Sequence, residues 1–181
     1  MAGLGDHAIE VEKLVMEDLG LGRAEVTTQI LQRDRYAELI CVLANLACSA
    51  DKFATEVRNL QRTEIDEARE PFDIKTQIGS SAMPHKMNPR ICENICSVAK
   101  IVRSLVQPSL ESVVTWHERD LTQSAAERFT ISEAFILTDH VLTSMNYVLS
   151  DLQVSPSHMA RNLELTGGME LSEAVVSALV K

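Results

Sequence analysis

The stretch YAELICVLANLACSADKFATEVRNL, residues 36–60, decides the fold class of this chain. Apolar or small residues recur in it at alternating intervals of three and four, at Tyr36, Leu39, Leu43, Leu46, Ala50, Phe53, Val57 and Leu60. This spacing is typical of a helix that packs nearly parallel to other helices. We therefore expect a helix from about residue 33 to residue 65, roughly 50 Å long at 1.5 Å per residue.

Two further runs carry the same helical spacing. The first is Ile91, Ile95, Val98, Val102 and Leu105, and we expect Pro108 to kink or split its helix. The second is Ile131, Phe135, Thr138, Leu142, Met145, Leu149 and Leu152. Only 4 % of the residues are aromatic, which disfavours a β-sandwich or barrel. The sequence thus predicts an all-α fold, a bundle of long, near-antiparallel helices without a sheet.

The C-terminal part reads as shorter helices. Ser155 is expected to be an N-cap with Pro156 in the first helical position, and Gly167 and Gly168 to stop that helix. The segment 169–181 starts one more helix. We divide the chain into a long-helix domain, 1–150, incomplete on its N-terminal side, and the start of a helical C-terminal domain, 151–181.

Composition excludes several classes of function. The net charge is −9 and no Lys/Arg cluster occurs, which argues against a nucleic-acid-binding surface. No apolar run approaches the ~18 residues of a membrane span, and no signal peptide opens the chain, so we expect a cytoplasmic protein. The four cysteines, Cys41, Cys48, Cys92 and Cys96, each lie in an apolar helical pattern, so we expect buried reduced thiols. Cys92 and Cys96 lie four residues apart without a second pair or nearby histidines, so we expect no metal site.

The loop GSSAMPHKMNP, residues 79–89, differs from its helical surroundings. Gly79 permits unusual backbone geometry, and Asn88 and Pro89 are expected as N-cap and first residue of the next helix. A helix N-terminus attracts anions, and Lys86 adds a full positive charge. These surroundings would stabilise the alkoxide that a serine must become to abstract a proton. The alternative is a polar connection between helices with a good N-cap.

The same loop resembles the G-S-S-x-M-P-x-K-x-N-P signature of the fumarase/aspartase superfamily, with every fixed position matched. Members of this superfamily eliminate fumarate from succinyl-containing substrates. A second stretch, WHERDLTQSAAER at 116–128, resembles the adenylosuccinate lyase family, although many relatives have His or Asn in place of Gln123. The likeness extends to TTQILQRDRYAE at 27–38 and RNLELTGG at 161–168.

The resemblance implies a role for each matching residue. Ser80 would be the general base, Lys86 and Asn88 would stabilise the aci-carboxylate intermediate, and Glu93 would orient a histidine of a neighbouring subunit. Contacts to substrate would come from Gln29, Ser81, Met83 and Asn94.

The nucleotide phosphate would be held by Arg119, Ser124 and Arg128. Ser124 and Arg128 also stand four residues apart at a predicted helix start, where both can face one anion. The alternative for Arg119 and Arg128 is surface pairing with Glu118 and Glu127.

The resemblance also sets expectations for the whole protein. Relatives use histidines of two earlier signatures, one of them the general acid, and neither signature occurs here; His7, His85, His117, His140 and His158 are not expected to be catalytic. We therefore read the chain as a fragment that would be inactive alone. Active sites in this superfamily are shared between the subunits of a homotetramer, and no cofactor is needed. The segment 75–87 is expected to be the most mobile internal one.

Three functions remain open at this point. The leading one is purine biosynthesis, with cleavage of adenylosuccinate to AMP and fumarate and of the related succinylated aminoimidazole carboxamide ribotide. A cycloisomerase of the same superfamily acting on carboxymuconate is disfavoured by the phosphate-binding set, since its substrate has no phosphate. A non-catalytic helical scaffold is disfavoured by the intact Ser80, Lys86 and Asn88.

Overall fold

The computed structural model describes residues 2–72, 83 and 87–180, and the described chain is mostly helical, which confirms the predicted fold class. The elements are η1 (Ala2–His7), α1 (Ala8–Leu19), α2 (Asp34–Leu60), β1 (Ala68–Arg69), α3 (Arg90–Ser104), α4 (Val106–Glu111), α5 (Ser124–Ser150), β2 (Gln153–Val154), α6 (Pro156–Leu163), η2 (Met169–Leu171) and α7 (Ser172–Leu179).

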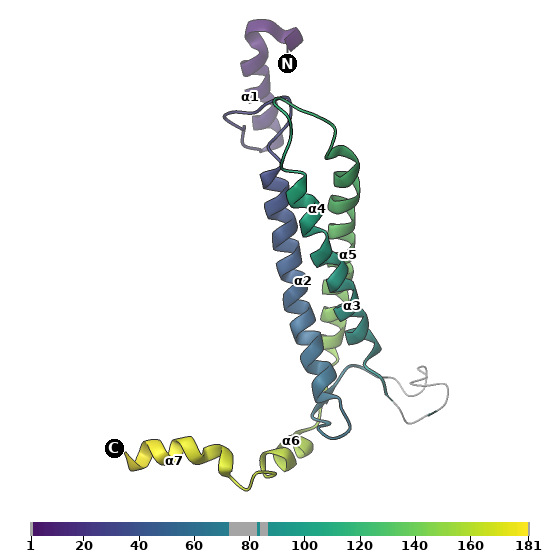
Figure 1. Ribbon diagram of the computed structural model, residues 1–181, viewed down its shortest axis with the longest axis vertical. Coiled ribbons are helices and arrows are strands. Elements are labelled where there is room, and N and C mark those ends of the chain that lie inside the picture. The colour runs from purple at the N-terminus through teal and green to yellow at the C-terminus, as the bar shows by residue number, and fades with distance from the viewer. Residues whose placement is uncertain (1, 73–82, 84–86, 181) are drawn as a thin grey trace.

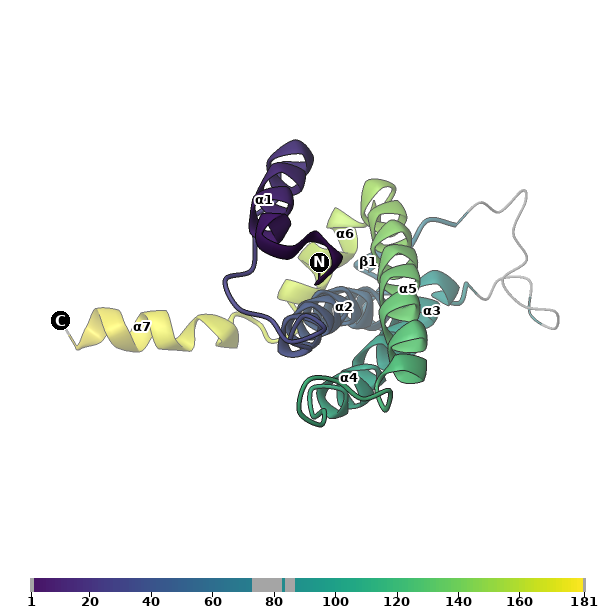
Figure 2. The same cartoon turned by 90° about the horizontal axis from the view of Figure 1, so that it is seen from above.

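The long helices α2, α3 and α5 form the bundle (Figure 1). α2 and α5 run in one direction, and α3, continued by α4, returns in the other. α1 lies to one side and α7 projects away from the bundle, as the view along the bundle shows (Figure 2). We call the end where α2 and α5 begin the upper end, residues 28–37 and 115–128. The lower end, residues 57–72 and 87–94, is where α2 stops and α3 starts.

α2 ends earlier than the expected residue 65, because the chain turns after Leu60. Asp66 has a φ of 49°, in the left-handed region that a helix cannot accommodate. The chain then continues into β1. The turn therefore begins the connection to α3, and residues 61–70 form part of the lower end of the bundle.

The bundle core uses only part of the expected seams of α2 and α5, whereas no residue of the expected seam from Ile91 to Leu105 is exposed. On α2, Leu43, Ala50 and Val57 are buried as predicted, together with the small side chains Ala37, Ala44, Ala47 and Ala54. The larger seam residues of α2 and α5 are exposed by 38–57 %, and they are Leu39, Leu46, Phe53, Phe135, Leu142 and Leu149. The seams expected from the spacing are therefore only partly packed within this chain. Alanines let the three helices approach closely, and the larger side chains point away from that contact.

Pro108 divides the third long helical segment as expected. α3 stops at Ser104 and α4 begins at Val106. The proline ring would clash with the carbonyl of the residue four positions earlier, which is Ser104, and it offers no N–H to that carbonyl. The break therefore falls one turn before the proline rather than at it.

The start of α3 differs from the prediction by one residue. α3 begins at Arg90, with Pro89 in the N-cap position and without a side-chain cap from its own neighbours. The cap comes instead from Glu70, whose carboxylate accepts hydrogen bonds from the backbone N–H groups of Ile91 and Cys92. A carboxylate at a helix N-terminus satisfies both the free N–H groups and the helix dipole, so the Asn88 cap expected from the sequence is replaced by a distant residue.

A short ladder contradicts the expectation of no sheet. β1 pairs antiparallel with β2, Ala68 with Val154 and Arg69 with Gln153. The Ser155 N–H extends it by donating to the Glu67 carbonyl at 2.8 Å. Two-residue strands carry no periodicity that a sequence could display, and they form because the segments after α2 and α5 meet at the lower end.

The C-terminal elements follow the expected order. Ser155 and Pro156 take the N-cap and first positions of α6, although the Ser155 hydroxyl contacts Ser157 and not the helix backbone. α6 stops at Leu163, before Gly167 and Gly168, whose φ angles of 61° and 89° turn the chain into η2. α5 ends at the proposed boundary, residue 150, but the division into two domains remains a prediction.

All four cysteines are free thiols, and only Cys92 and Cys96 are buried. The expectation of burial was wrong for Cys41 and Cys48, which lie on the exposed side of α2. Within the described residues, no group of histidines, cysteines and carboxylates is arranged to hold a metal ion. None of the described helices combines the length and the apolar character needed to cross a membrane.

Candidate functional site

A cavity of about 840 Å³ opens at the lower end of the bundle. Met83, Asn88 and Glu93, three of the residues singled out from the sequence, line it. The other lining residues come from the end of α2, the turn after it and the start of α3: Arg58, Gln61, Arg62, Thr63, Glu64, Asp66, Arg69, Met87 and Pro89. Guanidinium, carboxylate and amide groups thus face one space, which suits a charged, polar ligand.

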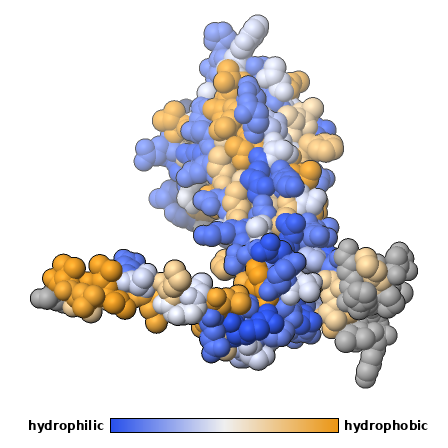
Figure 3. All heavy atoms as spheres, turned by 60° about the horizontal axis from the view of Figure 1, so that its bottom comes forward, coloured by the Kyte–Doolittle hydropathy of each residue, from blue (hydrophilic) through white to orange (hydrophobic). Residues whose placement is uncertain are grey.

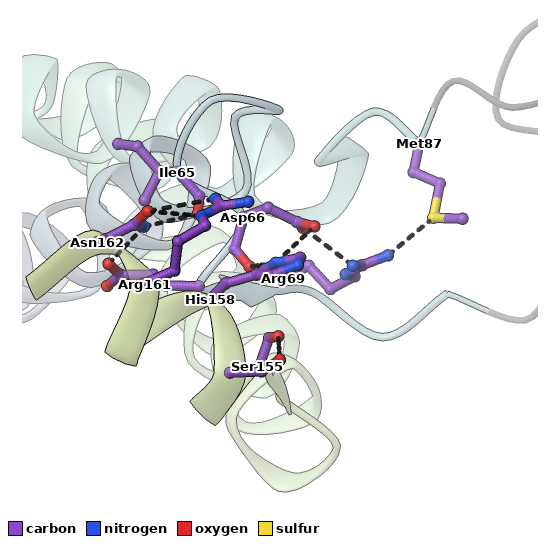
Figure 4. Close-up of polar contacts among 10 residues, drawn as sticks. Ile65, Asp66, Arg69, Met87, Ser155, His158, Arg161 and Asn162 are labelled. Atoms are coloured by element: carbon purple, nitrogen blue, oxygen red, sulfur yellow. Dashed lines mark hydrogen bonds and ion pairs between the residues drawn. The ribbon is translucent and has the colours of Figure 1, made fainter. Parts of the chain in front are cut away.

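Arg69 stands at the edge of this cavity between two contacts (Figure 4). Its guanidinium pairs with the Asp66 carboxylate at 2.9 Å and reaches the Met87 sulfur at 3.5 Å. Asp66 in turn binds His158 of α6, whose Nδ1 lies 3.0 Å from the carboxylate and 2.8 Å from the Asp66 carbonyl. A continuous set of polar contacts therefore links α6 to the residue before Asn88.

Asn162 fastens α6 to the same turn (Figure 4). Its amide nitrogen donates to the Ile65 carbonyl at 2.9 Å and to the Glu67 carboxylate at 2.8 Å. α6 has no buried residue, so these polar contacts and the β1–β2 pair hold it against the bundle.

The upper end carries the residues expected to hold a phosphate. Arg119 and Arg128 are exposed, and Ser124 is the half-buried first residue of α5. Glu127 pairs with Arg33 at 2.7 Å and not with Arg128, so the surface pairing considered for it is absent. Within the described residues, neither the Arg119 nor the Arg128 guanidinium has an ion-pair partner.

Asp120 organises the loop that presents Arg119. Its carboxylate accepts from the Trp116 N–H at 2.8 Å, and from the Thr122 N–H at 3.0 Å and hydroxyl at 2.6 Å. The Thr122 hydroxyl and these two N–H groups lower the pKa of Asp120 below its usual value, so the carboxylate is ionised at neutral pH. Hydrogen bonds of the Asp120 side chain thus hold the two ends of this loop together. The neighbouring Arg119 is exposed.

The two groups of candidate residues lie at opposite ends of the bundle (Figure 1). α2 and α5 each contain 27 residues, which corresponds to about 40 Å. Met83, Asn88 and Glu93 come together at the lower end, whereas Arg119, Ser124 and Arg128 stand at the upper end. Gln29 precedes α2, is exposed, and belongs to the upper end. A single chain does not bring both groups to one small molecule.

Asn94 lies beside Glu93 in α3, and its side chain is engaged within the chain. Its amide oxygen lies 2.7 Å from His140 Nε2 of α5. Ser80, Ser81 and Lys86, and nearly all of the segment 75–87 expected to be mobile, lie outside the described residues. Burial raises the pKa of the Cys92 thiol to about 12, with the Glu70 charge adding to it, so this thiol stays protonated at neutral pH.

Gln61, Asp66, Arg69 and Glu70 were missed by the sequence reasoning. They belong to the charged segment QRTEIDEARE, which looks like a solvated connection after a helix. One signal of a structural role for Glu70 was present: it directly precedes Pro71, in the segment that leads to the signature loop. Nothing in the sequence shows that Glu70 is buried, with only 3 % of the residue exposed.

A family model described as lyase matches residues 2–104, more than half of the chain. The chain belongs to the lyase family. It is a homologue of adenylosuccinate lyases, which confirms the resemblance of the signature loops. The enzyme of Methanothermobacter thermautotrophicus is 49 % identical over 180 residues, which is 99 % of this chain and 40 % of that protein. The Pyrococcus abyssi enzyme is 50 % identical with the same coverage.

Two solved structures have the same fold as this chain. The 3-carboxy-cis,cis-muconate lactonizing enzyme of Pseudomonas putida superposes with a TM-score of 0.84 at 34 % identity, over 98 % of this chain and 39 % of that one. A fumarate lyase from Mesorhizobium has a TM-score of 0.83 at 29 % identity, over 98 % of this chain and 38 % of that one. The chain spans about two-fifths of the length of the curated relatives that it matches.

Proposed function

We propose that this chain is part of an adenylosuccinate lyase of purine biosynthesis. The reaction is a β-elimination that releases fumarate from adenylosuccinate, giving AMP, and from the succinylated aminoimidazole carboxamide ribotide. The observation that carries the proposal is the complete signature Gly79–Pro89 in a chain about half identical to adenylosuccinate lyases along 99 % of its length. We expect the enzyme in the cytoplasm, without a cofactor.

The lower end is proposed to handle the succinyl group. Ser80 removes the Cβ proton, and Lys86 and Asn88 stabilise the doubly charged aci-carboxylate that results. Asn88 lines the lower cavity together with Glu93, and Glu93 would orient a histidine of another subunit. Ser81, Met83 and Asn94 complete the substrate contacts. The general acid is then a histidine outside this chain, because neither of the family's histidine signatures occurs in it.

The upper end is proposed to hold the nucleotide phosphate. Arg119 and Arg128 have no ion-pair partner within the described residues, so their charges are available to an anion. Ser124 opens α5, where free backbone N–H groups favour negative charge. Gln29 stands at the same end and would contact substrate there. This set favours a phosphorylated substrate over carboxymuconate.

Because the two ends are about 40 Å apart, one substrate can meet both only if they belong to different copies of the chain. The exposed apolar residues support such an assembly. Leu39, Leu46 and Phe53 repeat every seven residues on α2, and Phe135, Leu142 and Leu149 do so on α5. Seven-residue stripes of this kind are the seams of helix–helix contacts, so we propose a homotetramer joined through these helices. Hydrophobic side chains are visible on the bundle surface (Figure 3).

The similarity to muconate lactonizing structures makes carboxymuconate the second candidate substrate. A decisive experiment supplies the full protein containing this chain with adenylosuccinate or with carboxymuconate, and follows fumarate and AMP by chromatography. We expect fumarate and AMP in equal amounts from adenylosuccinate and no turnover of carboxymuconate. The 181-residue chain alone is expected to be inactive. Turnover of carboxymuconate only, or of neither compound, would reject the proposed function, and the second result would favour a scaffold.

A further inference from the structure

Gln61, the residue after α2, contacts the chain on both sides of the connection to α3. Its side-chain oxygen accepts from the Glu70 N–H at 3.0 Å, and its side-chain nitrogen donates to the Met87 carbonyl at 3.2 Å. Arg69 adds a contact to the Met87 sulfur (Figure 4). The side-chain amide of Gln61, next to α2, thus joins residue 70 to residue 87.

Glu70, whose N–H is bonded to Gln61, in turn binds the start of α3 through its side chain. The residue is 3 % exposed, and its carboxylate accepts from the Ile91 N–H at 3.1 Å and from the Cys92 N–H at 2.9 Å. A buried charge is tolerated only when it is compensated, and here the N–H groups and the helix dipole of α3 compensate it. A carboxylate suits this place because both of its oxygens accept hydrogen bonds and neither donates.

Gln61 and Glu70 therefore hold the backbone from Met87 to Cys92 at both of its ends, Gln61 at Met87 and Glu70 at Ile91 and Cys92. Asn88 lies inside this stretch, and Glu93 follows it directly, with its N–H bonded to the Pro89 carbonyl at 2.8 Å. Both side chains line the lower cavity. A shift of the first turn of α3 would move both of them together.

We propose that Gln61 and Glu70 are positioning residues of the lyase site, which set Asn88 and Glu93 for the elimination through the backbone 87–92. This inference rests on the proposed function. The two residues do not touch the reacting atoms, and they act by holding the groups that do. A displacement of about 1 Å in such groups costs up to about 100-fold in rate, so a loosened α3 start should lower kcat.

The first test measures hydrogen exchange of the backbone amides in the full protein that contains this chain. Glu70→Ala removes both acceptors, whereas Glu70→Gln places an NH₂ donor against the N–H groups of α3. We expect exchange at Ile91 and Cys92 to rise about 10- to 100-fold in Glu70→Ala and less in Glu70→Gln, with little change at Val98 and beyond. Glu56→Gln, an exposed carboxylate on α2, is the matched control and should change nothing. Unchanged exchange at Ile91 and Cys92 in Glu70→Ala would overturn the proposal.

The second test compares turnover per folded subunit in the full protein. Glu70→Ala and Gln61→Ala should lower kcat about tenfold or more while the KM of adenylosuccinate changes little. Val102→Ala, in the middle of the bundle, serves as a control for lost stability, because it creates a cavity in the core without touching the start of α3. It should lower the melting temperature and keep kcat per folded subunit.

The outcomes separate the two proposals. If the wild-type protein does not turn over adenylosuccinate, the proposed function fails, and with it the positioning role, whatever the exchange at Ile91 and Cys92 shows. If the wild type is active and Glu70→Ala loosens α3 without lowering kcat, the positioning role alone is wrong. A fall in kcat for Val102→Ala equal to that for Glu70→Ala would likewise reject it, because the effect would then follow stability.

Discussion

The lower and upper ends of the bundle carry their polar residues in different ways. At the lower end, the buried Glu70 carboxylate, the Gln61 side-chain amide and the Arg69–Asp66 ion pair hold the backbone around a cavity of about 840 Å³. At the upper end, Asp120 closes a surface loop, and Arg119 and Arg128 remain exposed. The difference fits the proposal that this chain preorganises one side of the site and that the other side meets a second copy.

This contrast makes distinct kinetic predictions for the two ends. Residues at the lower end should act mainly on kcat, because we propose that the chemical step takes place there. Those at the upper end should act mainly on KM, because they are proposed to hold a phosphate that does not react. Residues along the middle of the bundle should affect assembly or stability. Each of the variants below is made in the full protein.

Ser80→Ala should lower kcat by about 10²- to 10⁴-fold, the usual contribution of a general base, and should leave substrate binding largely intact. The hydroxyl is proposed to act only in proton abstraction, so its loss falls on the transition state. Turnover and equilibrium binding of adenylosuccinate measure the two effects separately. A near-normal kcat would exclude Ser80 as the base and reassign the lower end.

Leu46→Glu should dissociate the proposed tetramer, because it places a charge in the middle of an exposed apolar stripe on α2. An unpaired buried charge costs about 3–5 kcal/mol, so each affected contact should weaken at least 100-fold. Sedimentation velocity measures the mass of the assembly. Asn45→Glu, on the neighbouring exposed position, is the control and should leave the mass unchanged. An unchanged mass in Leu46→Glu would argue against assembly through α2.

Arg128→Ala should raise the KM of adenylosuccinate about 10- to 100-fold with little change in kcat, since a hydrogen bond to a charged group contributes about 1.5–3 kcal/mol. A nonphosphorylated analogue should lose little further in the same variant. Lys100→Ala, an exposed cation on α3, controls for general charge effects. A fall in kcat without a rise in KM would show that Arg128 acts in the chemical step and not in binding the phosphate.

Asp51→Asn tests the middle of the bundle, where the Asp51 carboxylate accepts from Arg103 at 2.8 Å and joins α2 to α3. Burial pushes the pKa of Asp51 up, but the hydrogen bonds from Cys96 and Arg103 outweigh it, so the pKa lies below the ordinary 3.8. A depressed folded-state pKa stabilises the fold above the unfolded pKa, and this contribution is lost as the pH falls through the folded value.

The wild type should therefore exceed Asp51→Asn by up to about 1 kcal/mol in unfolding free energy at pH 7, and the difference should shrink below about pH 4. Urea unfolding at pH 7 and pH 3 measures it. Both kinetic constants should stay near the wild-type values at neutral pH. A difference that persisted undiminished at pH 3 would show that the ion pair is not its source.

The long helices could be predicted from the sequence because three-four spacing is a local property of the chain. α2 begins within a residue of the expected position, and the Pro108 break follows from the geometry of one ring. The partner of each apolar side chain could not be predicted in this way. Leu43 and Leu46 belong to the same pattern, yet Leu43 is buried against α5 and the start of α4, whereas Leu46 is exposed. That choice depends on where the neighbouring helices lie.

The helical class, the family and the candidate residues follow from the sequence alone, because periodicity and contiguous signatures lie in neighbouring positions. Which candidates meet depends on the tertiary structure. It put Asn88 and Glu93 into one cavity and Arg119 and Arg128 at the far end of a helix about 40 Å long. It also brought Glu70 under α3, because a turn after α2 returns the chain to the helix start. Such contacts join residues 20 or more positions apart, and they depend on the path of the chain in space.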